Sequence, residues 1–196
     1  MLVVKIGGCN GSGKTSLVRA LIAQLAMQPL PHPTKPKRIH AYVGKIGKRK
    51  VYVLGSYVNA CGGMDTISCK HERLAMVKQF TLSKKDIVIF EGLITGKTYG
   101  ALGALSDEQH GRWIYAFMDT PFEKCVERVL QRRKEAGNDA PFDPERTMRS
   151  TFKSCQSVRK KVSDMPHHSV YDVNHKHPPA RAAKDLIQHI KTRLGE

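Results

Sequence analysis

The sequence predicts an α/β protein in which helices cover both faces of a parallel sheet. Short apolar runs, which are typical of buried strands, alternate along the chain with longer segments whose apolar residues recur at helical spacing. Glycine, proline and polar residues separate these segments. The chain has 196 residues, enough for one domain with a full hydrophobic core. We therefore expect a three-layer α/β/α sandwich.

The first third of the chain is expected to hold a strand, a helix and a hairpin. The apolar run at 2–6 reads as a buried strand, and apolar spacing predicts a helix over 14–27. Four prolines within 29–36 end this helix and predict an extended loop. Two β-rich runs then flank a basic connection that contains glycine, which predicts a β-hairpin insertion at about 38–57.

The rest of the chain keeps the alternation of helix and strand. Pro121 stands where a helix begins, and Phe122 and Val129 lie on its apolar face. The polar stretch 135–145 predicts a loop. The other elements that we expect, in chain order, are a helix over 71–82, a strand over 86–91, a short helix over 99–105, a strand over 113–118, a helix over 146–161, a strand over 169–173 and a helix over 180–194.

The charge of the chain is unusual in its size and in its distribution. The net charge is +16, and the calculated pI is about 9.8. Residues 1–64 contain ten lysines and arginines and no acidic residue, and the first carboxylate is Asp65. Such a stretch suits a polyanionic partner, although well-hydrated lysines on a basic protein are the plain alternative. No apolar run approaches the ~20 residues that a membrane span needs.

The cysteines and the N-terminus indicate the compartment. Five cysteines form an odd set without close pairing, which favours reduced thiols in the cytoplasm. The first eight residues run directly into a motif and leave no room for a signal peptide. Cys61, Cys69 and His71 are potential metal ligands, but their spacing fits no common zinc pattern, so we do not expect zinc.

A phosphate-binding motif follows the first expected strand. Residues 8–15 read Gly-Cys-Asn-Gly-Ser-Gly-Lys-Thr and match G-x-x-x-x-G-K-[ST], between a strand and a helix as the motif requires. Glycines let backbone N–H groups turn toward one anion at the start of a helix. Lys14 is expected at the β- and γ-phosphates and Thr15 at Mg²⁺. The predicted phosphate-binding residues are Gly8, Asn10, Gly11, Ser12, Gly13, Lys14, Thr15 and Ser16.

Two carboxylates are candidates for the metal and for the proton of an acceptor hydroxyl. Glu91 ends a buried strand, and ligands gather at the carboxyl ends of parallel strands. It is expected to act on Mg²⁺, either directly or through water, or as a base. Asp65 follows two glycines of the kind that let a loop approach a ligand, and it is the second candidate base. A strand-end ion pair for Glu91 and a turn cap for Asp65 are the structural alternatives.

Cations for a transferring phosphoryl group are expected on the helix that follows Pro121. Arg128 and Arg132 lie four residues apart and share one face, and Arg133 is adjacent. All three are predicted to stabilise negative charge, with a solvated basic helix as the alternative. Asn174 follows the last expected strand, where a nucleotide base can lie against the loop.

These features resemble the nucleoside and nucleotide kinase branch of P-loop proteins over nearly the whole chain. The resemblance depends on residues 8–15, on Phe90-Glu91-Gly92, on 119–121 leading into 128–133, and on 171–174. It implies a single domain over 1–196 with five parallel strands in the order 2-3-1-4-5. It also implies a lid at about 128–146 and contact between the last loop and adenine. No guanine-specificity motif of GTPases is present, which favours ATP.

A narrower set of segments looks like the phage-encoded kinases that phosphorylate 5-hydroxymethyluracil within DNA. These segments are 53–57, 61–67 and 91–100. The resemblance implies DNA as the substrate, a role in thymine hypermodification and, for a phage-encoded chain, the host cytoplasm. The acceptor group lies at pyrimidine C5, which faces the major groove, and a two-stranded ribbon can enter that groove. We therefore expect DNA contacts from the hairpin cations Lys45, Lys48, Arg49 and Lys50.

Two other functions remain open at this stage. A kinase of a free nucleoside or nucleotide would use the same phosphate loop with a closed substrate pocket. An ATP-switched nucleic-acid-binding module would hydrolyse ATP without phosphorylating its partner. The sequence decides neither the oligomeric state nor whether the base leaves the duplex to react.

Overall fold

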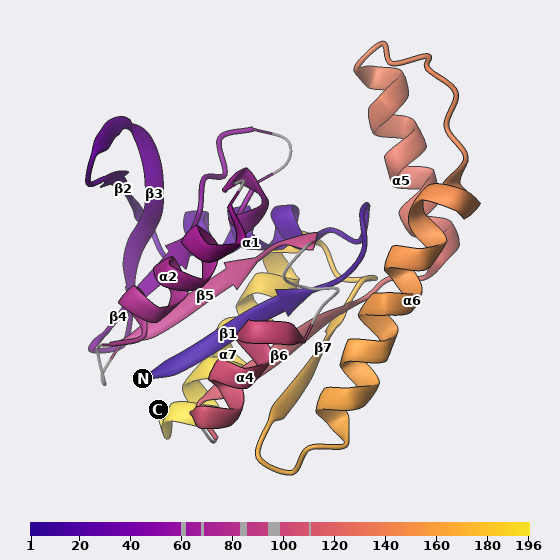
Figure 1. The fold of residues 1–196 in the computed structure, drawn as a ribbon. Helices are drawn as coiled ribbons and strands as arrows, with labels where there is room; N and C mark the ends of the chain where they lie inside the picture. Colours follow the sequence, from indigo (N-terminus) through magenta and orange to yellow (C-terminus); the bar gives the residue numbers. More distant parts are fainter. Residues whose placement is uncertain (60–61, 68, 83–85, 94–98, 110) are drawn as a thin grey trace.

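The fold is organised around one seven-stranded sheet with helices on both sides (Figure 1). We describe it from a computed structural model, which defines residues 1–59, 62–67, 69–82, 86–93, 99–109 and 111–196. The strands are β1 (Leu2–Gly7), β2 (Gln28–His32), β3 (Lys35–Ile46), β4 (Arg49–Leu54), β5 (Ile87–Glu91), β6 (Trp113–Asp119) and β7 (Ser169–Asn174). Within these described residues, the helices are α1 (Lys14–Gln24), η1 (Met64–Thr66), α2 (Lys70–Phe80), α4 (Gly100–Glu108), α5 (Phe122–Glu135), α6 (Pro144–Ser163) and α7 (Pro179–Leu194).

The strand order corrects part of the expected fold. The sheet runs β2-β3-β4-β5-β1-β6-β7 and is mixed, so the expected sheet of five parallel strands is wrong as a description of the whole. Five neighbouring strands, β4-β5-β1-β6-β7, do pair in parallel. Numbered among themselves, they have the order 2-3-1-4-5. The two additional strands, β2 and β3, extend this set by antiparallel pairing.

The expected hairpin insertion belongs to the sheet itself. β3 and β4 form a hairpin whose turn lies at Gly47 and Lys48, and β4 is also the edge of the parallel set. The segment 29–36 is not an irregular loop, because β2 pairs with β3 through Pro29 and Pro31. Proline lacks the N–H that an inner strand must donate, but β2 is an edge strand and tolerates it. Register shifts on either side of Pro31 mark the irregularity that results.

Two apolar cores hold the helices on the sheet. α1 and α7 pack on one face, where Leu17 and Leu186 belong to the same core as the β1 residue Val4. α2, α4 and α6 cover the other face through side chains that include Val77 and Val158. The alternation of side chains along each strand feeds both cores, which makes the three-layer arrangement. Among the described helices, none is long and apolar enough to cross a membrane.

A third, smaller core joins the phosphate loop to a pair of helices that project from the sheet. α5 and α6 rise as a helical hairpin at one side of the molecule (Figure 1). Phe122 and Val129 of α5 pack with Met148 of α6 and with Cys9 of the loop after β1. The expected lid region, 128–146, is therefore the outer part of this hairpin and its connecting loop. Its base is anchored to the phosphate loop.

Candidate active site

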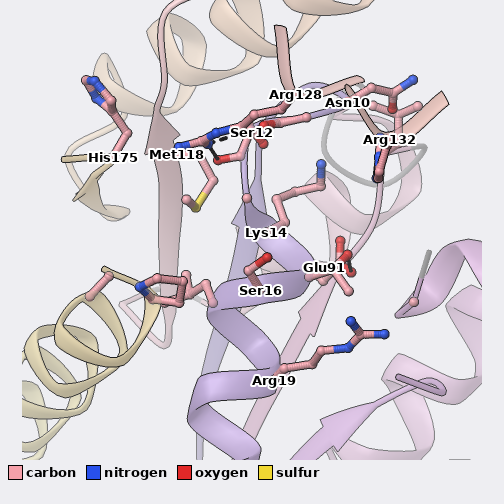
Figure 2. Close-up of a pocket in the computed structure, with 18 of the residues that line it drawn as sticks. Asn10, Ser12, Lys14, Ser16, Arg19, Glu91, Met118, Arg128, Arg132 and His175 are labelled. Carbon is pink, nitrogen blue, oxygen red and sulfur yellow. Dashed lines mark hydrogen bonds between the residues drawn. The ribbon is translucent and has the colours of Figure 1, made fainter. Parts of the chain in front are cut away.

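A cleft of about 630 Å³ lies at the carboxyl edge of the parallel strands. Its lining comes from the loop after β1, the start of α1, the end of β5, the loop near η1, α5 and the segment after β7 (Figure 2). Parallel strands that end together leave their following loops at one edge, which is where ligands bind in open α/β sheets. The fold therefore gathers segments that are far apart in the sequence.

The loop between β1 and α1 forms the floor of this cleft. The residues from Asn10 to Ser16 line it, whereas Gly8 lies behind and presents its carbonyl. Lys14 is buried and donates from Nζ to the carbonyl oxygens of Gly8 at 2.8 Å and Cys9 at 2.9 Å. Gly11 has φ 75°, and a Cβ there would meet the Cys125 carbonyl oxygen at 2.2 Å. Only glycine fits where the loop packs against α5.

A carboxylate and a hydroxyl meet beside Lys14. Thr15 donates from Oγ1 to Glu91 Oε1 at 3.1 Å, and Glu91 is only 1% exposed. Burial raises the pKa of Glu91 to about 7, and the nearby positive charge of Lys14 and the Thr15 hydrogen bond only partly oppose this. Two oxygen atoms in this position are ligands of the kind that Mg²⁺ prefers. A cation here would also offset the unfavourable burial of the carboxylate, so the residues present fit the metal.

A glycine-rich turn brings a second carboxylate to the same end of the cleft. Gly63 has φ 74°, and a Cβ there would lie 2.6 Å from the carbonyl oxygen and 2.8 Å from Oε1 of Glu91. This close approach places Asp65 in the cleft lining, where its Oδ2 accepts a hydrogen bond from the Leu93 N–H. The negative charge of Asp65 is close enough to contribute to the raised pKa of Glu91. The two candidate carboxylates therefore lie together.

The three predicted arginines do not share one location. Arg128 and Arg132 line the cleft from α5, and Arg128 Nη1 donates to the Gly11 carbonyl at 3.3 Å. Arg133 lies outside the cleft lining. Its Nη2 donates to Asn138 Oδ1 at 3.1 Å and to the Ala140 carbonyl, and its guanidinium stacks on Phe142 at 4.7 Å from the ring centroid. Arg133 therefore contacts the loop of the expected lid region, and its role at the transferring group stays a prediction.

The opposite end of the cleft is formed by the segment after β7. Asn174 lines it together with His175 and His177. The Asn174 side chain accepts a hydrogen bond from the Lys176 N–H at 2.9 Å, and His177 Nδ1 lies 3.0 Å from Asp185 Oδ2. These contacts fix the loop where the sequence resemblance implies adenine. The cleft thus runs from Asn174, across Lys14, to Glu91 and Asp65.

The hairpin cations lie elsewhere. β4 runs parallel to β5, with Val51 opposite Ile87 and Val53 opposite Ile89, so the turn before β4 lies at the amino edge of the sheet. The cleft is at the carboxyl edge. At the amino edge, Arg49 forms a 3.5 Å ion pair with Glu196. The expected DNA contacts of Lys45, Lys48, Arg49 and Lys50 would therefore lie at the edge of the sheet opposite the cleft, and that expectation stays a prediction.

Several residues of the cleft were missed by the sequence reasoning. Arg19 lines the cleft and donates from Nε to the Tyr57 carbonyl at 3.1 Å, which ties α1 to the loop after β4. Met118, His175 and His177 also line it. The signal for Arg19 was its place four residues after Thr15, on the same helix face. Part of the sequence pattern stays untested, since Cys61 and residues 94–98 lie outside the described residues.

Comparison with known proteins identifies similar chains and similar folds. No protein-family model matches. A protein named "5-hmdU DNA kinase" from Pseudomonas phage M6 is 31% identical over 162 residues, 76% of this chain and 82% of the relative. Another of that name, from Pseudomonas phage PaMx11, is 29% identical over 161 residues, 82% of this chain and 84% of the relative. A third, from Delftia phage PhiW-14, is 24% identical over 198 residues, 94% and 72% of the two chains.

Solved structures support the fold. A gluconokinase from Sinorhizobium meliloti superposes with a TM-score of 0.56 at 13% identity, over 98% of this chain and 95% of its own. Shikimate kinase from Aquifex aeolicus gives 0.52 at 16% identity over the full length of both chains. Fold, cleft and relatives together define a P-loop kinase, an ATP-dependent phosphotransferase. Within this class, the chain belongs to the family of phage proteins named 5-hmdU DNA kinase.

Proposed function

We propose that the chain transfers the γ-phosphate of ATP to the hydroxymethyl group of 5-hydroxymethyluracil in DNA, as a step in phage thymine hypermodification, in the cytoplasm of the host cell. The observation that carries this proposal is the hydrogen bond between the half-buried Thr15 hydroxyl and the buried Glu91 carboxylate, beside Lys14. It occurs in a chain whose relatives are named for that substrate. The charge of +16 suits a polyanionic acceptor.

The phosphate loop binds and orients the donor. Backbone N–H groups at the start of α1 face the phosphates, and the helix terminus adds its partial positive charge. Lys14 moves from its carbonyl partners to the β- and γ-phosphates, because a phosphate is a stronger acceptor for an ammonium than a neutral carbonyl. Asn174 and His175 bound the adenine end of the cleft.

Thr15 and Glu91 are the residues that would hold Mg²⁺. When bound, the ion would supply positive charge that offsets the negative charge of the phosphates during transfer. Glu91 is held by Thr15 on one side and by the close approach of Gly63 on the other. This confinement keeps its carboxylate in one place, and so it needs no rearrangement during the reaction.

The acceptor end of the cleft receives the hydroxyl. Its oxygen attacks the γ-phosphorus, the bond between that phosphorus and the bridging oxygen breaks, and ADP leaves. Asp65 takes the hydroxyl proton, while Glu91 serves the metal side; this divides the two roles that the sequence left open. Arg128 and Arg132 lie over the cleft and stabilise charge on the transferring group.

The depth of the site bears on how DNA reaches it. Glu91 is 1% and Lys14 is 7% exposed. A base paired inside a duplex cannot bring its C5 substituent to such a recessed point, so we infer that the base leaves the stack. Placing the modified base opposite a mismatch should then raise the rate, because less unpairing energy is needed. An equal rate for matched and mismatched sites would contradict extrusion of the base.

A test of the proposed function compares acceptors directly. The wild-type protein is given ATP and Mg²⁺ with free 5-hydroxymethyldeoxyuridine in one reaction and with DNA that contains this base in another. Phosphate on the base in DNA supports the proposal. Phosphate on the free nucleoside alone would favour a nucleoside kinase, and ATP hydrolysis without a phosphorylated product would favour a nucleic-acid-binding module.

A further inference from the structure

The strongest unassigned feature of the molecule is a two-stranded ribbon that stands beside the acceptor end of the cleft. β3 pairs with β4 only from Ala41 onward, opposite Leu54. Before that point, residues 35–39 pair with β2 alone. The part of β2 and β3 between Leu30 and Ile39 therefore leaves the sheet as a free ribbon, visible as the arch in Figure 1. We call it the proline ribbon.

The strand register places the proline ribbon at the same edge as the active site. Val53 lies opposite Ile89, so Leu54 and its partner Ala41 lie just before the level of Glu91. Residues that precede Ala41 in antiparallel β3 extend beyond that level. At about 3.3 Å per residue, Lys37 stands roughly 10 Å past Glu91 along the strands. Two strand spacings of about 4.8 Å separate β3 from β5.

The strand order also places the ribbon on the correct side of the cleft. Glu91 ends β5 and Asn174 ends β7, with β1 and β6 between them. The ribbon extends from β3, two positions beyond β5 and away from β7. It therefore stands beside the acceptor end of the cleft rather than the adenine end. A long acceptor that enters at Asp65 and Glu91 passes the ribbon.

The ribbon carries charge without partners for it. Lys35, Lys37 and Arg38 are exposed, and no ion pair among the described residues involves them. Successive strand residues point to opposite faces, so Lys37 and Arg38 present cations on both sides of the ribbon. The first 64 residues contain no acid that could neutralise them.

Four prolines explain why such a projection keeps its shape. Pro29 and Pro31 lie on β2, Pro33 lies in the connection, and Pro36 follows Lys35. Each fixes φ and removes a backbone donor, which stiffens the ribbon and prevents a further strand from pairing along β2. The exposed edge is thus unsuited to strand addition, and the side chains remain as the groups that can bind a partner.

We propose that the proline ribbon binds the phosphate backbone of DNA next to the base that is being phosphorylated. The inference rests on the proposed function and adds the surface that selects DNA over a free nucleoside. Lys37 lies roughly 10 Å beyond Glu91 along the strands and about 10 Å from it across two strand spacings, which together give a distance of about 14 Å. DNA advances 3.4 Å for each base pair, so this distance corresponds to roughly four base pairs. Phosphates that flank the acceptor base are therefore within reach.

The chain offers a matched control for this inference. The ribbon variant replaces Lys35, Lys37 and Arg38 by Gln. The tip variant replaces Lys45, Lys48 and Lys50 by Gln, removing the same charge at the opposite edge of the sheet. Both sets are exposed, so each substitution leaves the cores intact. The two variants separate a local contact from the general effect of net charge.

Binding to a duplex of about three helical turns is measured by fluorescence anisotropy over a range of salt concentrations. Each lost phosphate contact reduces the magnitude of the slope of log K against log salt by about 0.9. The slope of the ribbon variant, which lacks three cations, should therefore be smaller in magnitude than the wild-type slope by about 2 to 3. The tip variant should keep the wild-type slope. Equal slopes for the two variants, whether both fall or neither does, would overturn the ribbon as the DNA-binding element.

Phosphate transfer is measured in parallel, so that the two proposals can fail separately. With the duplex as acceptor, the ribbon variant should show at least about a tenfold higher KM for DNA than the tip variant, as expected for losing contacts that position the acceptor. A wild-type protein that binds DNA through the ribbon but places no phosphate on it would refute the proposed function alone. A protein that phosphorylates DNA with the same KM in both variants would refute the ribbon alone.

Discussion

The carboxyl and amino edges of the sheet both carry basic residues, yet only one of them forms a site. At the amino edge, Lys45, Lys48 and Lys50 are exposed around a tight turn. At the carboxyl edge, Lys14 is buried against backbone carbonyls and lies close to the buried carboxylate of Glu91. The difference shows that a cluster of positive charge does not by itself identify an active site. What distinguishes the carboxyl edge is that the charged groups of Lys14 and Glu91 are buried away from water. In such an environment electrostatic interactions are stronger, and each buried charge needs a partner.

The largest effect is expected at Lys14. Lys14→Ala removes the ammonium that meets the β- and γ-phosphates and should lower kcat/KM for phosphate transfer by about 10³-fold. Lys48→Ala at the amino edge serves as its control and should stay close to the wild type in a steady-state assay. If the activity of Lys14→Ala stayed within about threefold of the wild type, the claim that the carboxyl edge rather than the amino edge holds the active site would be contradicted.

Substitution of Glu91 should lower activity and raise stability together. Glu91→Gln keeps the size of the side chain and its contact with Thr15 but loses the charge, and we expect kcat to fall by about 10² to 10³-fold. The measurement is a rate assay at saturating ATP and Mg²⁺. Activity that persists in the variant would move the metal role to another residue.

The stability effect of Glu91→Gln depends on pH. Burial raises the pKa of Glu91 from 4.5 to about 7, so its favourable contribution to folding is complete below pH 4.5 and is lost as pH rises through about 7. The loss amounts to about 3 kcal/mol, and Gln has no such dependence. Urea unfolding without ATP or metal should therefore show Glu91→Gln gaining about 3 kcal/mol relative to wild type between pH 4 and about pH 8. A constant difference would contradict the raised pKa.

The two neighbouring arginines of α5 should separate clearly. Arg132→Ala removes a cation from the cleft and should lower kcat by about 10²-fold. Arg133→Ala removes contacts with Asn138 and Phe142 instead, and should change kcat by less than about threefold while destabilising the lid region by about 1 kcal/mol. Thermal unfolding and initial rates together check this. Equal rate losses would restore Arg133 to the catalytic set.

The smallest effect is expected at a glycine. Gly63→Ala places a Cβ within 2.8 Å of Glu91 Oε1 and should displace that carboxylate by a few tenths of an ångström, lowering kcat about tenfold. Gly137→Ala has a similarly positive φ of 61° but no atom within 4 Å of its Cβ. This control should cost about 1 kcal/mol of stability and leave kcat near the wild type. The same rate for both variants would show that only backbone strain matters.

Local signals allowed much of the site to be predicted from the sequence. The phosphate loop is a continuous motif, and Glu91 followed from the rule that ligands gather where parallel strands end. Local signals do not predict the direction in which the β3–β4 hairpin points. Only the parallel pairing of β4 with β5 determines that the turn of the hairpin lies at the edge opposite the cleft. The strand at Pro29 and Pro31 was missed for a related reason: proline excludes an inner strand, and edge position is a tertiary property.

Whether an individual side chain lines the cleft depends on its contacts in the folded chain, and the sequence shows only some of these. Arg128 and Arg132 share a helix face, which spacing reveals, whereas Arg133 lies about 100° further round the helix. Its partners, Asn138 and Phe142, belong to a loop whose path the sequence does not specify. Asn174 was selected because it follows a strand. His175 and His177 belong to the same loop and line the cleft, but neither carried a signal that distinguished it from a surface histidine.

The central claim is that this site phosphorylates a base within DNA, and mass spectrometry tests it most directly. DNA that contains 5-hydroxymethyluracil is incubated with the protein, ATP and Mg²⁺, freed of ATP, and digested to nucleosides without phosphatase acting on the base. We predict that the modified nucleoside gains the mass of one phosphoryl group with the wild type and not with Lys14→Ala. An unchanged nucleoside mass from wild-type reactions, in a preparation that phosphorylates the free nucleoside, would contradict the claim.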